Sequence, residues 1–212
     1  GVSNRSGMKY LAPVKDHAVG ARLQRFQFKQ TDTHIIEFGN NYIRFMRNDA
    51  HITETPVVIT GVTAANPAVV TTSGAHGYTN GDEVFISGVL GMTELNNGRY
   101  LVGNVAATTM ELTDQLTGVA LDSSAFTAYG SAGTVAKIYE IASTYTTAEL
   151  PLLKFSQTAD VMTIVHPDHN PARLSRLAVD SWTLTDIEFS PSTVAPTLIA
   201  AGAGSGPPTY YS

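Results

Sequence analysis

The amino-acid sequence predicts a mainly β protein, in which a discontinuous β domain contains an inserted small β-barrel or sandwich and one short helix. Three observations support this fold class: short segments alternate between apolar and polar residues, Gly and Asn turns separate them, and the composition changes near residue 57. The chain has 212 residues, of which 43% are hydrophobic and 15% are charged. This is enough apolar chain to bury a core, and too little charge for a disordered protein.

The first part of the chain, residues 9–56, is expected to open the discontinuous domain with strands. One strand with a single buried face is indicated by three apolar residues that stand among polar ones: Leu23, Phe26 and Phe28. Residues 34–38 and 42–47 are predicted to pair as a hairpin across Gly39-Asn40-Asn41, because glycine and asparagine tolerate positive φ. The expected core positions of this hairpin are Ile36, Phe38, Ile43 and Phe45.

The insert, residues 57–137, is rich in Gly, Thr, Val, Ala and Asn, with almost no Lys or Arg. Its strand signals lie at 57–60, 68–72, 83–87, 99–102 and 109–112. Five short strands at such even spacing, separated by turns, predict a small barrel or sandwich. Residues 134–141 are then expected to lead the chain back out of the insert.

The chain after the insert is expected to complete the first domain. Thr146 followed by Glu149 is a capping-box signature for a short helix, which Pro151 keeps short. Strands are predicted at 161–165 and 172–177, around a turn of residues 166–171, and the alternation of 182–189 predicts a last strand.

These elements divide the chain into four parts. The first domain is expected to consist of residues 1–56 and 138–190, and the inserted barrel module of residues 57–137. Residues 191–212 are expected to form a Pro/Gly/Ala-rich linker and the start of a further domain. Because the chain begins at Gly1 and stops where a strand is expected to begin, we expect it to be part of a longer protein.

Composition excludes several classes of function. The absence of Cys excludes disulfides, thiolate metal centres and a Cys nucleophile. A net charge of −5 with only 13 basic residues argues against binding to phosphate backbones, so we expect no sequence-specific nucleic-acid binding. No apolar run approaches the roughly 20 residues of a membrane helix, so we expect no membrane insertion.

The densest group of candidate chemical residues is His166, Asp168 and His169. They could offer ligands to a metal ion, or a base to a hydrolase. Zinc sites usually need three protein ligands, however, and the other histidines are distant in the sequence. Two prolines in this segment favour a tight turn with exposed polar tips. We expect a turn, and leave open whether His166 and His169 bind a metal.

Other candidate groups also have a structural interpretation. The Gly-rich stretches 74–77 and 88–91 are bounded by strands, which does not fit a phosphate-binding loop. Four carboxylates could act as glycosidase groups only if folding brought two of them together: Glu37, Glu83, Glu111 and Asp186. Five aromatic residues could stack on sugars, but strand aromatics usually fill core positions: Tyr42, Tyr78, Tyr100, Tyr129 and Trp182. We therefore assign no catalytic, cofactor-binding or metal-binding residue, and expect no enzymatic activity and no cofactor.

Two stretches outside the insert carry a family resemblance. Residues 21–47, ARLQRFQFKQTDTHIIEFGNNYIRFMR, resemble a recurrent opening segment of large tail proteins of tailed bacteriophages and prophages. Residues 145–189 resemble the segment that follows it, with the pattern Leu-Lys-aromatic-x-Gln-Ser/Thr-Ala-Asp, an apolar strand and a polar turn. In this chain the octapeptide is LKFSQTAD at residues 153–160, the apolar strand is residues 161–165, and the polar turn begins with His166-Pro167. The chain is similar to the N-terminal part of the tail tubular, or nozzle, proteins of short-tailed phages, which are several times longer.

The insert and the end of the chain carry further resemblances. Residues 68–112 are similar to a β-barrel module of phage tail proteins and to a half-domain of ubiquitin-activating enzymes. From the second likeness we take only the barrel, because no Cys or adenylation motif accompanies it. The terminal PPTYYS resembles the first strand of a fibronectin type III domain.

The resemblance implies a structural protein of the virion tail, made in the cytoplasm of the bacterial host. Copies of the chain would assemble as a ring, commonly of six, contact adaptor or neighbouring tail proteins, and help to form the conduit for DNA. An acidic, Lys-poor chain suits a channel that passes DNA without binding it.

Two other functions stay open. The inserted barrel could bind a host-surface glycan or another receptor. The chain could also be a tail-associated polysaccharide hydrolase, which would need two carboxylates at glycosidase separation, or a third ligand that closes on His166 and His169. The sequence does not separate a short-tailed nozzle from a hub or distal-tail protein of a long-tailed phage.

Overall fold

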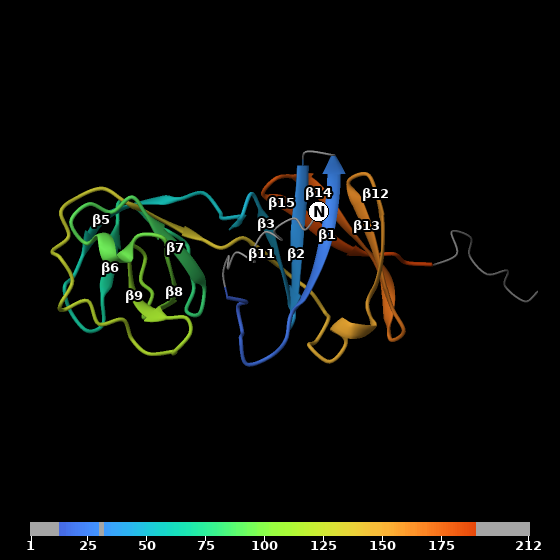
Figure 1. The fold of residues 1–212 in the computed structure, drawn as a ribbon, viewed down its shortest axis with the longest axis horizontal. Helices are drawn as coiled ribbons and strands as arrows, with labels where there is room; N and C mark the ends of the chain where they lie inside the picture. Colours follow the sequence, from blue (N-terminus) through green and yellow to red (C-terminus); the bar gives the residue numbers. More distant parts are fainter. Residues whose placement is uncertain (1–12, 30–31, 190–212) are drawn as a thin grey trace, which may run out of the picture.

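The computed structural model describes residues 13–29 and 32–189, and these form two β units side by side along the long axis (Figure 1). The predicted linker and further domain at 191–212 lie outside the described residues. The first unit contains two sheets and the second is a closed barrel. The predicted fold class, mainly β with an inserted barrel, is confirmed. Among the described residues, no helix is long and apolar enough to span a membrane.

The first unit is a sandwich of two antiparallel sheets. One sheet has the order β1-β2-β3-β11, with β4 paired to β3, and the other has the order β12-β13-β14-β15. The strands of the first sheet are β1 (Arg22–Lys29), β2 (Asp32–Gly39), β3 (Tyr42–Arg47), β4 (Ala50–His51) and β11 (Glu140–Ala142). Those of the second are β12 (Lys154–Thr158), β13 (Val161–His166), β14 (His169–Ala178) and β15 (Ser181–Asp186).

The β2–β3 hairpin follows the sequence prediction. Asn41 has a φ of 62°, the left-handed conformation that asparagine accepts in a tight turn. All four predicted core residues of this hairpin are fully buried: Ile36, Phe38, Ile43 and Phe45. The prediction for β1 was only partly right. Phe26 is fully buried, but Leu23 is 57% exposed because it lies on the opposite face of the strand.

The core between the two sheets contains residues from both ends of the chain. The ring of Phe45, on β3, stacks on Trp182, on β15, with ring centroids 4.4 Å apart. Phe26, on β1, contacts the same Trp182 edge-on at 4.8 Å. Further buried members come from the second half: Tyr145, Leu150, Leu153, Met162, Ile164 and Leu174. Segments separated by the whole barrel thus share one core.

The second unit is a closed six-stranded barrel of order β10-β5-β6-β9-β8-β7. Its strands are β5 (Val57–Val62), β6 (Val69–Thr72), β7 (Glu83–Ser87), β8 (Gly98–Gly103), β9 (Thr109–Asp114) and β10 (Thr134–Lys137). The five predicted strands are all present. Residues 134–141 lead the chain back to the sandwich as expected, but their first part also forms a sixth barrel strand that was not predicted, because Val135 pairs with both Val57 on β5 and Ile86 on β7 and so closes the barrel.

Two chain segments connect the barrel to the sandwich, and they are hydrogen-bonded to each other. Thr53 and Ile138 form an antiparallel bridge between them. The Glu54 N–H donates to the Lys137 carbonyl at 2.8 Å, and the Tyr139 N–H donates to the Ile52 carbonyl at 2.9 Å. The connection is therefore a short two-stranded ribbon.

The predicted short helix is a single 3₁₀ turn, η2 (Leu150–Leu152). The Glu149 carboxylate accepts the Thr146 N–H at 2.7 Å, which is one half of the predicted capping box. Pro151 has no N–H to donate, so the helix does not continue. A second 3₁₀ turn, η1 (Thr93–Leu95), lies in the barrel and was not predicted.

Candidate functional site

Two clusters of polar side chains stand out, and the first contains the histidines that the sequence singled out. His166 is the last residue of β13 and His169 the first residue of β14, and the two are register partners. The turn between them is therefore only Pro167-Asp168, shorter than the predicted turn of 166–171. The expectation of exposed polar tips was wrong for His166, which is 7% exposed because its ring points into the sandwich side of the hairpin.

Glu149, which the sequence offered only as a helix cap, completes this cluster. One ligand atom from each of Glu149, His166 and His169 can be chosen so that all three lie within 4.8 Å of one another. The His169 Nε2 lies 3.0 Å from the Glu149 Oε1. The other carboxylate oxygen accepts the N–H and hydroxyl of Thr146, at 2.7 and 2.8 Å. The hydrogen bonds from Thr146 and His169 lower the pKa of Glu149 to about 2.

Sequence reasoning missed this partnership because Glu149 lies 17 positions before His166 and belongs to a different element. The only local signal was the spacing of Thr146 and Glu149, which fixes the carboxylate near the η2 turn. Two imidazoles and one carboxylate are donors that a zinc-type ion accepts. The group could equally act as a hydrogen-bonded brace between the η2 turn and the β13–β14 hairpin.

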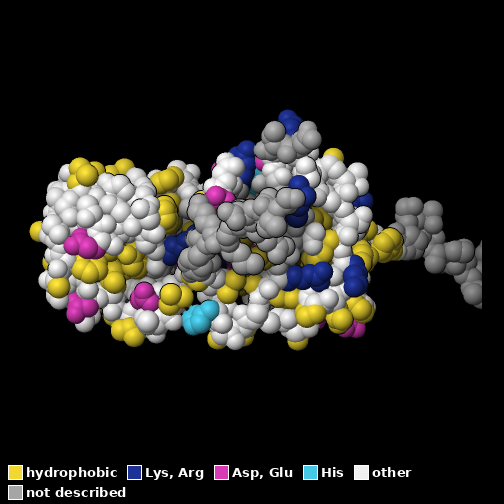
Figure 2. Space-filling view, viewed as in Figure 1, with side chains coloured by type: hydrophobic (Ala, Val, Ile, Leu, Met, Phe, Trp, Pro, Cys, Tyr) yellow, Lys and Arg dark blue, Asp and Glu magenta, His cyan; other side chains and the backbone are white. Residues whose placement is uncertain are grey.

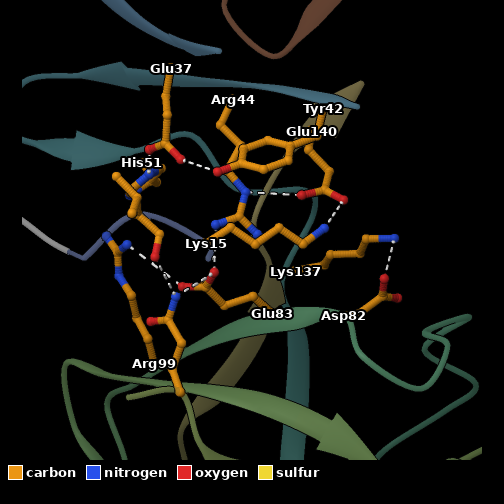
Figure 3. A network of polar contacts seen from close by, with 12 residues as sticks. Lys15, Glu37, Tyr42, Arg44, His51, Asp82, Glu83, Arg99, Lys137 and Glu140 are labelled. Carbon is orange, nitrogen blue, oxygen red and sulfur yellow. Dashed lines mark hydrogen bonds and ion pairs between the residues drawn. The ribbon is translucent and has the colours of Figure 1, made fainter. Parts of the chain in front are cut away.

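The second cluster is a network of charges where the sandwich meets the barrel (Figure 3). At its centre lies Arg44, a residue of β3 whose side chain is 1% exposed. Its Nη1 lies 2.5 Å from Glu83 Oε2, on β7 of the barrel. Its Nε lies 2.9 Å from Glu140 Oε2, on β11. Burial opposes the charge of Arg44, but Glu83 and Glu140 outweigh it and raise its pKa.

Further partners surround this centre. Lys15 Nζ lies 2.6 Å from Glu140 Oε1, and Gln115 Nε2 donates to Glu83 Oε2 at 3.2 Å. Burial acts to raise the pKa of Glu140, whereas its bonds to Lys15 and Arg44 lower it, and the lowering prevails. Arg44 and Glu140 therefore hold each other in the charged state.

A buried pair at the edge of the network joins Glu37 and Tyr42. The Tyr42 hydroxyl donates to Glu37 Oε1 at 2.7 Å, and His51 Nε2 lies 3.5 Å from Glu37 Oε2. Burial acts to raise the pKa of Glu37, but the contacts with His51 and Tyr42 lower it. Burial and the bond to Glu37 raise the pKa of Tyr42. Neither group is a free acid or base.

A pocket of about 620 Å³ opens beside the network at the junction of the two units. Lys15, Lys137 and Glu140 line it, together with Tyr42 and Gln115. Lys137 Nζ pairs with Asp82 at 3.0 Å, so opposite charges alternate around the pocket (Figure 3). This arrangement neutralises charge around the pocket. It does not concentrate one sign of charge on a ligand.

The structure brings two of the four candidate carboxylates into the buried network and leaves the other two outside it. Glu37 and Glu83 are buried in the network, whereas Glu111 accepts a bond from Asn104 on the barrel and Asp186 ends β15. The prediction that the strand aromatics fill core positions is confirmed for Tyr42, Tyr78, Tyr100 and Trp182, which are all buried. Tyr129 packs partly against the barrel core, and its hydroxyl donates to the Ile59 carbonyl at 3.0 Å.

Sequence reasoning missed Arg44 and Glu140 as members of a buried network. A signal was present in the strand YIRFMR, where Arg44 stands between apolar residues in a strand that is buried on both faces. Such a residue needs buried partners, because an isolated buried charge is strongly unfavourable. Their identity depended on how the barrel docks on the sheet, which no local pattern reveals.

Comparison with known proteins gives one family likeness for the barrel. The family model of the ubiquitin-activating enzyme E1 FCCH domain matches residues 65–138. The match begins before β6 and extends past β10, so it covers all the barrel strands except β5. No curated protein sequence matches the chain significantly. The barrel of this chain is therefore similar to the FCCH domain, and the match covers a minority of the chain.

Proposed function

We propose that this chain is a structural component of a bacteriophage or prophage virion tail, made in the bacterial cytoplasm. It forms part of the tail tube or nozzle, together with other copies of itself in a ring, for which the resemblance implies six copies, and with neighbouring adaptor or tail proteins. Its role is assembly and not catalysis.

One observation carries this proposal. The two stretches that resemble phage tail proteins, residues 21–47 and 145–189, are far apart in the sequence but share a single core. Phe45 from the first stretch stacks directly on Trp182 from the second. The two resembling stretches therefore build one structural unit, and the insert between them folds as a separate barrel. This arrangement is what we expect if the sandwich is the tail-protein unit and the barrel was inserted into it.

The distribution of charge supports a protein that lines or surrounds a DNA conduit. The barrel segment 57–137 contains six acidic residues and two basic ones, Arg99 and Lys137. On the face shown in Figure 2, Lys and Arg side chains lie over the junction and the sandwich, and the barrel surface is uncharged or acidic. An acidic surface repels DNA phosphates, so DNA would pass along it without binding.

The surface of the sandwich also supports assembly with neighbours. Large apolar side chains remain exposed on it: Leu23, Leu152, Leu177 and Phe189. The last strand of the second sheet, β15, also pairs on one side only. Exposed strand edges and apolar side chains are surfaces that a neighbouring subunit can cover.

The decisive experiment locates the protein in particles. Phage particles would be induced from the bacterium that encodes the chain, purified by density, and analysed by peptide mass spectrometry and by gold-labelled antibody to residues 57–137. We expect its peptides in the particles at several copies per virion and the label at the tail. Peptides found only in the cell lysate would contradict the proposal.

The mass in solution gives a second, independent test. Light scattering would compare the chain with the full product of its gene over a wide concentration range. A ring-sized full product supports the tail-tube function, and a monomeric chain beside it places the ring contacts outside residues 1–212. If the chain and the full product are both monomers, and the chain binds a glycan saturably, receptor recognition by the barrel would be favoured instead.

A further inference from the structure

We propose that Glu149, His166 and His169 form a binding site for one divalent transition-metal ion of the zinc type. The ion would tie the segment before η2 to the β13–β14 hairpin. This inference is independent of the tail function, because it rests only on side chains within the sandwich.

The first argument is the donor set and its spacing. One ligand atom from each residue lies within 4.8 Å of the others, and His169 Nε2 is already 3.0 Å from Glu149 Oε1. Tetrahedral zinc with bonds of about 2.0–2.1 Å places its ligand atoms about 3.4 Å apart. Small side-chain rotations therefore suffice to bring the three donors to bonding distance. A water molecule would take the fourth position.

The second argument is that the carboxylate is held by a residue outside the donor set. Thr146 donates its N–H and its hydroxyl to Glu149 Oε2, at 2.7 and 2.8 Å, and this leaves Oε1 directed at His169. The Tyr145 ring packs edge-on against the His169 ring, with centroids 5.2 Å apart. Metal ligands are commonly oriented in this way by hydrogen bonds and packing from behind.

The third argument is a ring nitrogen that lacks a partner. His166 is 7% exposed, and its Nε2 is buried without a hydrogen-bond partner among the described residues. Leaving such an atom unpaired costs about 1–3 kcal/mol. The other nitrogen, Nδ1, accepts the N–H of Asp168 at 3.1 Å. Nε2 is thus the ring nitrogen that has no partner among the described residues.

Binding at Nε2 has a consequence for the ring proton. With Nδ1 accepting from Asp168, the proton of the neutral ring lies on Nε2. Coordination displaces this proton, and solvent returns it to Nδ1. The Asp168 N–H then faces the Nδ1–H, a second donor, so the Asp168 peptide must shift away from the ring, and water can take the hydrogen bond of this N–H because Asp168 is exposed. The Asp168 amide should therefore report on occupancy of the site.

The test uses the untagged chain of residues 1–212, purified in chelator and then titrated with zinc chloride against a chromophoric competitor. Cobalt chloride serves as a second probe, because tetrahedral Co²⁺ gives intense visible absorption. The variants are Glu149→Gln and His169→Gln, both at partly exposed positions. The matched control is His17→Gln, which removes an exposed histidine outside the cluster. Thermal unfolding in chelator verifies that each variant folds.

We expect one zinc ion per wild-type chain, a tetrahedral cobalt spectrum, and a shift of the Asp168 amide resonance. Glu149→Gln and His169→Gln should each weaken zinc binding about tenfold or more, whereas His17→Gln should bind as the wild type does. Zinc should also raise the melting temperature of the wild type and not that of the two variants. No stoichiometric binding, or binding that both variants retain, would overturn the proposal. Loss in the His17→Gln control would assign the metal to another part of the chain.

Discussion

At the scale of single residues, the sandwich core contains a histidine whose ring has no hydrogen-bond partner among the described residues. His34 is fully buried beside Trp182, with ring centroids 5.4 Å apart, and neither of its ring nitrogens has a hydrogen-bond partner among the described residues. Burial lowers the pKa of His34, Asp32 opposes this shift, and Arg176 and Arg47 reinforce it. The native fold therefore accommodates the neutral ring.

This burial predicts that acid destabilises the native state through His34. Because the pKa of His34 is below its ordinary value of 6.5 in the native state, the unfolded chain binds the proton more readily. Stability should fall as the pH drops below about 6.5, until the native residue is protonated as well. We expect His34→Leu to be tolerated at pH 7, since no hydrogen bond of the ring is lost. Relative to the wild type, the variant should be more stable at pH 5 than at pH 7.

Urea unfolding of both proteins at pH 7 and pH 5 measures this difference. The comparison cancels the other titrating groups, which both proteins share. An equal loss of stability between the two pH values in wild type and variant would contradict the assignment to His34.

At the scale of elements, the free edge of β1 is covered by a single side chain of β12. The Gln27 N–H donates to Gln157 Oε1 at 3.1 Å, and Gln157 Nε2 donates back to the Gln27 carbonyl at 2.8 Å. One amide thus takes the place of a neighbouring strand at this position and joins the two sheets. It also protects an edge that would otherwise be open to pairing with another chain.

Removing this amide should loosen the edge without unfolding the sandwich. We expect Gln157→Ala to cost about 0.5–1.5 kcal/mol and to speed hydrogen exchange at the Gln27 amide. Gln157→Glu keeps the acceptor but replaces the donor with a second acceptor beside the Gln27 carbonyl. Hydrogen exchange at the Gln27 amide should therefore stay slow in Gln157→Glu, although this variant is less stable than the wild type. Equally fast exchange in both variants would show that the amide does not cap the strand.

The loop between β7 and η1 depends on a glycine. Gly91 has a φ of 91°, and a Cβ at this position would lie 2.3 Å from the Ala128 carbonyl oxygen. Gly91→Ala should therefore destabilise the barrel by more than about 1 kcal/mol, from backbone strain and this overlap. Gly74→Ala is the control, because a Cβ there meets nothing within 4 Å. Thermal unfolding of both variants measures the contrast, and equal melting temperatures would contradict it.

These elements also explain what the sequence could and could not predict. Local patterns predicted the β2–β3 hairpin, because alternation and the turn at Asn41 act within a few residues. They did not predict the role of β10, since pairing with both β5 and β7 is a property of the closed barrel. Local patterns did not predict the contact between Glu149 and His169 for the same reason. This contact joins two elements, and its geometry is set by the packing of the sandwich.

At the scale of the whole molecule, the buried charges determine how the two units are joined. Arg44 belongs to the sandwich and Glu83 to the barrel, and the pair is almost completely buried. Replacing Glu83 leaves Arg44 with Glu140 alone, and replacing Arg44 leaves Glu83 with only the longer contact of 3.7 Å to Arg99. A buried charge that loses its best partner costs more than the net contribution of an intact pair. The junction should therefore tolerate loss of the whole pair better than loss of one member.

This argument predicts a strongly non-additive mutant cycle. Arg44→Met should cost about 3–5 kcal/mol, because Glu83 and Glu140 both lose their buried cation. The double variant Arg44→Met/Glu83→Gln should be less destabilised than the sum of its two single variants. Lys137→Met, which removes the more exposed pair with Asp82, is the control and should cost about 0–1 kcal/mol.

Urea unfolding gives the four free energies of the cycle, and hydrogen exchange followed separately in barrel and sandwich strands shows where each variant opens. If the network couples the units, Arg44→Met should speed exchange on both sides of the junction, in β7 as well as in β3. Additive free energies, or faster exchange confined to β3, would mean that the two-stranded ribbon alone holds the barrel in place.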